Sequence, residues 1–155
     1  MTREYPEYPI PAVGAIAISN GKILLVRRGS PPAKGFWSIP GGVIEVGERI
    51  EDAVRREFKE ETGLECEVLN LYHITQAIIK DDEGRVRYHY IILDYFVKVV
   101  NEEEPKPGGD VLEAKWVRIE DAMKLNLTRS ARELLKKLMT GISKKSLDQQ
   151  IRHVR

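Results

Sequence analysis

The sequence has few of the features that would place a protein in a membrane, outside the cell or on a nucleic acid. Cys66 is its only cysteine, which excludes an internal disulfide and favours a reducing compartment. No apolar run approaches bilayer-spanning length, and the opening residues MTREYPEYPIP lack the pattern of a secretory signal. The net charge of +1 offers no electrostatic reason to bind a nucleic-acid polymer. We therefore expect a cytoplasmic protein with no membrane or nucleic-acid partner.

Asparagine and glutamine are also scarce. The chain has four Asn and three Gln beside abundant Glu, Lys and Arg, a balance that favours a thermophilic source. The remaining composition is typical of a soluble globular protein, with 42% of residues hydrophobic and 32% charged. Its 155 residues are the length of one domain.

Three segments divide the chain. Residues 1–11 are rich in proline and predict an extended N-terminal arm. Residues 12–140 carry the alternating patterns of a folded domain. Residues 141–155 show no clear core face, and we expect a C-terminal tail that is helical or takes part in a dimer contact. Because an arm of this kind can be exchanged between protomers, the two ends together predict a homodimer.

Strand and helix patterns are both present in the domain. The strand-like runs are AVGAIAIS (12–19), KILLVRR (22–28), ECEVLNLYHITQAIIK (65–80), RVRYHYIILDYFVKVV (85–100) and EAKWVRI (113–119). Asn20-Gly21 predicts a tight hairpin between the first two, and DDEG a turn in a longer hairpin. Helices are expected over 49–62, ending before Gly63, and over 128–139, between a Thr128 cap and Gly141. Strands on both sides of a central helix indicate an α+β sandwich.

The helix over 49–62 places carboxylates on its apolar face. At about 100° per residue, Ile50, Val54 and Phe58 share one arc. Glu57 and Glu61 fall within the same arc, and Glu60 lies at its edge. A carboxylate on a core-facing stripe is costly unless something neutralises it, and a hard divalent cation does so. The alternative is a solvated helix edge on which these glutamates pair with neighbouring arginine and lysine side chains.

The residues upstream favour the cation site. The segment from Gly42 to Leu64 resembles the signature of the Nudix hydrolases. It consists of Gly42, five residues, Glu48, seven residues and then REFKEETGL. Seven positions are identical to the signature: Gly42, Glu48, Arg56, Glu57, Glu60, Glu61 and Gly63. Phe58 stands where that family usually has an aliphatic residue, which we interpret as a packing variant. The preceding GFWSIPGG, the later EAKWV and the terminal helix extend the resemblance over most of residues 12–139. It implies the Nudix fold, a mixed β-sheet sandwiched between helices in α/β/α layers.

The resemblance also implies roles for these residues. Glu57, Glu60 and Glu61 are expected to bind Mg²⁺ or Mn²⁺, with Glu57 also acting on the attacking water. Glu48 supports the cluster or adds a ligand, and Arg56 fixes the carboxylates by charge-assisted hydrogen bonds. The backbone carbonyl of Gly41 is a further candidate ligand. The implied reaction is hydrolysis of the diphosphate in a nucleoside diphosphate linked to another group.

Other candidates have ordinary structural alternatives. Asp110 and Glu113 lie before the last strand, where some relatives carry an extra ligand or base, although both residues could simply be solvated. Arg27 and Arg28 could hold phosphate or end a strand in solvent. The aromatic residues Phe36, Trp37, Tyr88 and Tyr90 could stack on a base, although aromatic residues in strands often pack in the core.

The substrate is less constrained by sequence. The residues after the signature, Ile79 to Asp82, match neither the proline typical of ADP-ribose enzymes nor the tyrosine typical of diadenosine polyphosphate enzymes. GFWSIPGG together with RYHY resembles small prokaryotic ADP-ribose pyrophosphatases, so we rank ADP-ribose first. Hydrolysis of oxidised or non-standard nucleoside triphosphates is the alternative. A Nudix-fold regulator that senses a nucleotide without cleaving it is a third hypothesis, which the intact acidic cluster disfavours.

Overall fold

A computed structural model describes residues 3–101 and 103–141. The strands in these residues are β1 Ile10–Ser19, β2 Lys22–Arg28, β3 Trp37–Ser38, β4 Gly41–Val43, β5 Cys66–Lys80, β6 Val86–Val99 and β7 Val111–Arg118. The helices are α1 Ile50–Thr62, α2 Ile119–Ala122 and α3 Arg129–Gly141. Among the described residues no helix combines the length and apolarity needed to cross a membrane. The mixture of strands and helices confirms the predicted α+β class.

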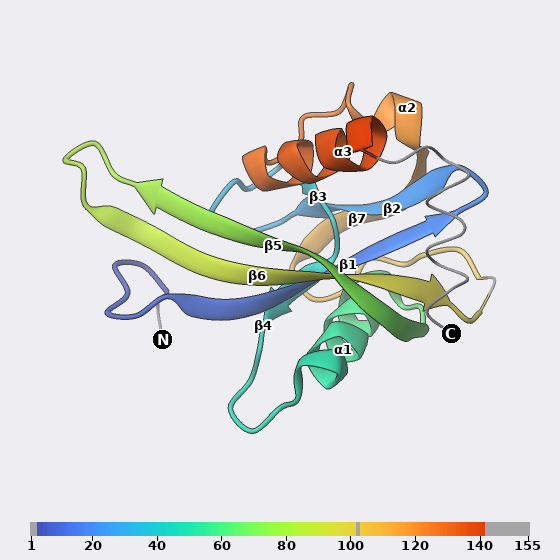
Figure 1. The fold of residues 1–155 in the computed structure, drawn as a ribbon, viewed down its shortest axis with the longest axis horizontal. Helices are drawn as coiled ribbons and strands as arrows, with labels where there is room; N and C mark the ends of the chain where they lie inside the picture. Colours follow the sequence, from blue (N-terminus) through green and yellow to red (C-terminus); the bar gives the residue numbers. More distant parts are fainter. Residues whose placement is uncertain (1–2, 102, 142–155) are drawn as a thin grey trace.

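The strands form one mixed sheet built around β1 (Figure 1). In the described part of the chain the order is β3-β2-β1-β6-β5, with β4 also pairing with β1 and β7 with β2. β1 runs parallel to β6 between Ile10 and Ala17 and then turns back into antiparallel β2. Asn20 and Gly21 have φ angles of 52° and 77°, the left-handed pair that a tight hairpin requires. β1 therefore connects the two halves of the sheet.

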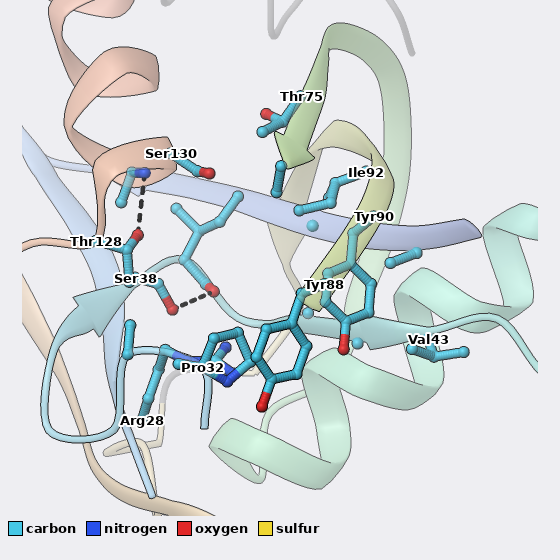
Figure 2. Close-up of a pocket in the computed structure, with 18 of the residues that line it drawn as sticks. Arg28, Pro32, Ser38, Val43, Thr75, Tyr88, Tyr90, Ile92, Thr128 and Ser130 are labelled. Atoms are coloured by element: carbon cyan, nitrogen blue, oxygen red, sulfur yellow. Dashed lines mark hydrogen bonds between the residues drawn. The ribbon is translucent and has the colours of Figure 1, made fainter. Parts of the chain in front are cut away.

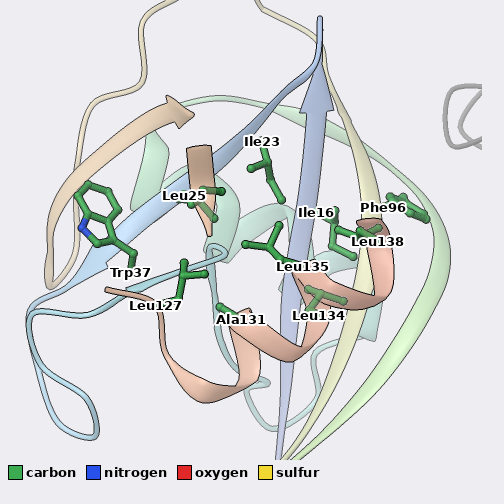
Figure 3. Packing of buried hydrophobic residues seen from close by; sticks show 11 residues of the cluster. Ile16, Ile23, Leu25, Trp37, Phe96, Leu127, Ala131, Leu134, Leu135 and Leu138 are labelled. Atoms are coloured by element: carbon green, nitrogen blue, oxygen red, sulfur yellow. The ribbon is translucent and has the colours of Figure 1, made fainter. Parts of the chain in front are cut away.

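Helices α1 and α3 cover opposite faces of this sheet (Figure 1). Alternate residues of β1 point to opposite faces, as in any strand. One core cluster joins β1 and β2 to α1 through Val13, Ala15, Ala17, Leu24, Ala53, Val54 and Phe58. The other joins them to α3 through Ile16, Ile23, Leu25, Trp37, Phe96, Leu127, Ala131, Leu134, Leu135 and Leu138 (Figure 3). Burial on both faces produces the predicted α/β/α layers.

Several element boundaries differ from those predicted. Ile10 and Pro11, assigned to the arm, already belong to β1, where the Pro11 carbonyl accepts a hydrogen bond from Ile44 N–H. The short helix α2 was not predicted, because four residues carry too little periodicity. Thr128 does cap α3, since its Oγ1 accepts the Ala131 N–H at 3.1 Å. The tail predicted from residue 141 lies outside the described residues from position 142 on.

Candidate active site

A cleft of about 1240 Å³ extends from Glu57 and Glu61 of α1 to the first residues of α3. It is bordered by β1, β4, β5 and β6, by the loop after β2 and by the start of α3 (Figure 2). Glu57, Glu61 and Asp110 line one part of it. This volume is above the usual range for small-molecule sites.

The helical face predicted to carry carboxylates does turn inward. The Glu61 residue is only 9% exposed, and the Glu57 side chain only 14%. Glu60, at the edge of the arc, has a side chain that is 52% exposed. The α1 backbone ends as expected at Gly63, whose φ of 74° is suited to glycine. Two glutamates therefore share the buried face of α1 with Phe58.

Burial makes this acidic group electrostatically costly. It raises the pKa of the Glu61 carboxyl to about 8, and the Gly41 N–H that donates to Glu61 Oε1 at 2.9 Å only partly offsets this. The charges of Glu57 and Asp110 raise the pKa of Glu61 further. Burial also raises the pKa of Glu57, despite its hydrogen bond from Arg56. Three mutually repelling carboxylates at one cleft wall form an environment that a cation would neutralise.

Gly42 allows the close approach of β4 to α1. A Cβ atom at this position would collide with all three carboxylate atoms of Glu57. The absence of a side chain therefore lets the Glu57 carboxylate rest against the main chain of β4. This contact is a physical reason for the glycine at the start of the signature.

Arg56 links the acidic residues to one another. Its Nε and Nη2 donate to both oxygens of Glu48, at 2.7 and 2.9 Å, in a bidentate pair. Its Nη1 donates to Glu57 at 2.7 Å and to Glu60 at 3.3 Å, and Nη2 also reaches the Val43 carbonyl at 3.0 Å. Arg56 thereby contacts three glutamates through charge-assisted hydrogen bonds.

The oxygen donors suit Mg²⁺ or Mn²⁺ in type, although they are not yet gathered around one point. Within residues 3–101 and 103–141, no three His, Cys, Asp or Glu side chains form a ready group of metal ligands. Glu57 and Glu60 both accept hydrogen bonds from Arg56 Nη1.

The two acidic candidates before the last strand separate in space. Asp110 lines the cleft, and its charge raises the pKa of Glu57 and Glu61. It also accepts a short hydrogen bond from Ser30 Oγ. Glu113 is exposed on β7, paired with Arg27 in the sheet, and is not part of the cleft. Of this pair, the structure therefore brings only Asp110 to the acidic residues.

The two arginines separate in the same way. Arg28 lines the cleft while its Nε donates to the Pro32 carbonyl at 2.7 Å. Arg27 Nε donates to the Gly35 carbonyl at 3.0 Å, and its side chain does not line the cleft. Arg28 is thus the arginine placed to meet an anionic group in the cleft.

Two of the four aromatic candidates reach the cleft. Tyr88 and Tyr90 lie side by side on β6, with ring centroids 6.3 Å apart and planes 16° from parallel (Figure 2). Trp37 is instead packed in the α3-side core, with the Lys115 ammonium 4.7 Å from its ring centroid. Phe36 is half-exposed outside the cleft. Trp37 belongs to β3, a strand of two residues that gives no alternating pattern from which its burial could be predicted.

Sequence reasoning missed two contributors to the cleft. Asp94 is a buried carboxylate in the middle of β6, and the lone acidic residue in the run YHYIILDYFV was the available signal. Glu4 comes from the N-terminal arm and accepts hydrogen bonds from Tyr88 Oη at 3.0 Å and Arg87 Nη2 at 2.9 Å. The arm thus packs on the β5–β6 hairpin of its own chain, a contact that no local pattern indicates.

The three-layer fold and the acidic cleft define a hydrolase domain of a recognisable class. The family model described as the NUDIX domain matches residues 9–138. The chain therefore belongs to the Nudix hydrolase family, whose members act on phosphoric anhydride bonds of small nucleotide substrates and generally use divalent metals.

Relatives and solved structures agree with this assignment. The chain is 39% identical over 118 residues to an ADP-ribose pyrophosphatase of Methanocaldococcus jannaschii, covering 76% of this chain and 67% of that protein. It is 37% identical over 129 residues to the nucleoside triphosphatase NudI of Escherichia coli, covering 76% and 88%. A MutT Nudix hydrolase structure from Burkholderia pseudomallei superposes with a TM-score of 0.74 at 28% identity, covering 86% of this chain and all of that one.

Proposed function

We propose that this Nudix hydrolase cleaves ADP-ribose to AMP and ribose 5-phosphate and requires Mg²⁺ or Mn²⁺. The observation that carries the proposal is the placement of Glu57, Glu61 and Asp110 within a cleft of about 1240 Å³ that also holds paired tyrosines. The acidic part suits a cation and its diphosphate, and the remaining volume suits a ligand with two bulky ends. The similarity to an archaeal ADP-ribose pyrophosphatase supports the same substrate.

Each residue has a defined task in this proposal. Glu57, Glu60 and Glu61 hold the cation, the Gly41 carbonyl and Asp110 supply further oxygen atoms, and Arg56 and Glu48 keep the helix carboxylates oriented. A bound divalent cation would neutralise phosphate charge and lower the pKa of the attacking water. Glu57 orients that water and accepts its proton.

Two further side-chain types position the substrate. Arg28 offers its remaining guanidinium donors to a phosphate oxygen, because only Nε is used by Pro32. Tyr88 and Tyr90 present near-parallel rings on which a base or sugar can pack. We propose that these contacts select nucleotides over inorganic pyrophosphate.

A second candidate substrate is a nucleoside triphosphate, oxidised or non-standard, that is hydrolysed to a monophosphate. The similarity to NudI, which extends over 88% of that protein, is the observation that favours it. The third hypothesis, a regulator that binds a nucleotide without cleaving it, is disfavoured because the acidic residues and Arg56 are all in place.

The test is a hydrolysis screen with Mg²⁺, Mn²⁺ or EDTA, over ADP-ribose, dinucleotides and the common and oxidised deoxynucleoside triphosphates. The proposal expects AMP and ribose 5-phosphate from ADP-ribose, with the highest kcat/KM of the set and none in EDTA. Faster release of pyrophosphate from a triphosphate would replace ADP-ribose by the second candidate. Nucleotide binding without any turnover would favour the regulator.

We also propose a homodimer. Supporting it, β5 lies at the edge of the sheet in the described residues, and apolar side chains on the β5–β6 hairpin are exposed: Leu71, Ile74, Ile78 and Ile91, each between 38% and 50%. Sedimentation that shows a fully active monomer at micromolar concentration would refute it. A cytoplasmic location and a thermophilic source rest on composition and stay predictions.

A further inference from the structure

The side chains that strand β6 contributes to the cleft change from aromatic to acidic along the strand. Its alternate residues Tyr88, Tyr90 and Ile92 line the cleft (Figure 2). Asp94 lines it too, because side chains two apart share a face. The series therefore runs from two aromatic rings through an aliphatic side chain to a carboxylate. The proposed hydrolytic chemistry uses the rings and does not use Asp94.

Asp94 is buried with half of its hydrogen-bonding capacity unused. The residue is 2% exposed, and Thr75 Oγ1 donates to its Oδ2 at 2.6 Å. Its Oδ1 points toward Gly14, where a Cβ atom would collide with it. No hydrogen bond to Oδ1 is found among the described residues, and this atom is not among those fully sealed from solvent. Oδ1 thus has no hydrogen-bond partner in the described part of the chain, and Asp94 lines the cleft.

Burying this carboxylate reduces the stability of the fold. Burial raises its pKa to about 6, and only the Thr75 hydroxyl and the charge of Lys137 on α3 act in the other direction. A hydrophobic residue of similar size would avoid this cost. Polar groups that weaken the fold in this way are expected where a ligand makes use of them.

The position of Asp94 relates it to the acidic residues. Gly41, which donates to Glu61, pairs with Gly14 of β1, and Gly14 pairs with Asp94 of β6. Two strand spacings, roughly 10 Å, therefore separate the main chains of Gly41 and Asp94. That separation is comparable with the length of one nucleoside, so a nucleotide with its phosphate at Glu61 can reach Asp94.

We propose that Asp94 is a specificity-determining residue, whose Oδ1 accepts a hydrogen bond from the nucleoside held in the cleft. The donor is an N–H or O–H group, and the exocyclic amino group of adenine and the ribose hydroxyls are its two sources. Thr75 positions the carboxylate by occupying Oδ2. This inference rests on the proposed function only in taking a nucleotide as the ligand, whichever nucleotide is cleaved.

The test compares binding of three nucleotides by calorimetry with Mg²⁺ at neutral pH. AMP carries both donors, purine riboside 5′-monophosphate lacks the amino group, and 2′,3′-dideoxy-AMP lacks the hydroxyls. The wild-type protein is expected to bind AMP about 10- to 100-fold more tightly than the analogue that lacks the recognised donor, as for a hydrogen bond to a charged acceptor. The weaker analogue identifies the source.

Asp94→Asn removes the charge at nearly constant volume, but the Thr75 hydroxyl can either donate to the Asn carbonyl or accept from the Asn amino group. Asp94→Leu has no acceptor in either orientation and is therefore the decisive variant. It is expected to bind AMP and the weaker analogue equally. Asp121→Asn, a matched loss of charge on α2 away from the cleft, keeps the wild-type preference. Thermal melting verifies that each variant is folded.

The outcomes separate this inference from the proposed function. A preference that persists in Asp94→Leu overturns it, as does equal weakening of all three nucleotides, which would indicate a structural role. Absence of nucleotide binding by the wild-type protein also overturns it. If ADP-ribose is not the substrate, the protein does not hydrolyse ADP-ribose but still discriminates among the three nucleotides.

Discussion

Arg56 illustrates how one side chain can order an acidic site before a cation arrives. Its bidentate pair with Glu48 anchors the guanidinium, and its remaining N–H groups hold Glu57 and Glu60. Pairs of this kind contribute geometry more than net stability, because desolvating the charges offsets most of their attraction. Arg56 is therefore expected to act on the affinity for the metal and on its placement.

Asp94 should make the stability of the protein depend on pH. Its folded-state pKa is raised from 3.8 to about 6, so folding favours the protonated carboxyl. The wild-type protein therefore loses stability as the pH rises from about 4 to about 6, by up to about 3 kcal/mol. Asp94→Asn has no such titration, so its free energy of unfolding should rise relative to that of wild type between about pH 4 and about pH 6. Above this window the difference should stay constant. Urea unfolding at several pH values measures the difference.

The exposed charge at Asp121 supplies the comparison. Asp121→Asn should leave the free energy of unfolding within about 0.5 kcal/mol of wild type at each pH, as is usual for surface substitutions. A difference between Asp94→Asn and wild type that stays constant from pH 4 to pH 7 would show that folding does not raise the pKa of Asp94.

The approach of strand β4 to helix α1 depends on Gly42. Gly42→Ala is sterically allowed by the backbone, which is not in the left-handed region, but the new Cβ displaces the Glu57 carboxylate. We expect kcat to fall at least about tenfold and stability to fall by about 1–3 kcal/mol, as for other overpacked sites. Steady-state kinetics and urea unfolding measure the two effects.

A shorter acid provides the control for this steric explanation. In the double variant Gly42→Ala with Glu57→Asp, the side chain no longer extends to the new methyl group, so the melting temperature should recover while activity stays low. Full activity in Gly42→Ala alone would show that the close contact with Glu57 has no catalytic role.

Elements with strong local signals could be predicted from the sequence. Asn20-Gly21 marks the first hairpin, Gly63 ends α1 and Thr128 caps α3, and each appears in the structure with the expected backbone or hydrogen bond. The inward orientation of Glu57 and Glu61 followed from helical geometry alone. These features depend on residues only a few positions apart.

Features that depend on distant residues could not be predicted. The parallel pairing of β1 with β6 joins Gly14 to Asp94, and nothing near either residue indicates it. For the same reason the sequence did not separate Asp110 from Glu113, or Trp37 in the core from Tyr90 in the cleft. Which face a strand residue occupies is set by the register of the whole sheet.

The whole domain should respond to metal through its stability. A cation that binds only the folded protein stabilises it, by about 2.7 kcal/mol at a hundredfold excess over Kd. For a chain of this size the melting temperature should then rise by about 5–10 °C in Mg²⁺ or Mn²⁺, with Na⁺ at equal ionic strength as the control. An identical melting curve in both solutions, also with AMP present, would count against a cation site.

The identity of the catalytic centre is tested most directly by turnover of Glu61→Gln beside Glu65→Gln. The two substitutions are chemically identical, but Glu61 lies in the acidic part of the cleft and Glu65 pairs with Lys59 on the surface. With Mg²⁺ and ADP-ribose, or the best substrate of the screen, Glu61→Gln should lose at least about a hundredfold in kcat while remaining folded. Glu65→Gln should match wild type. Full turnover by a folded Glu61→Gln protein would contradict the assignment of this site.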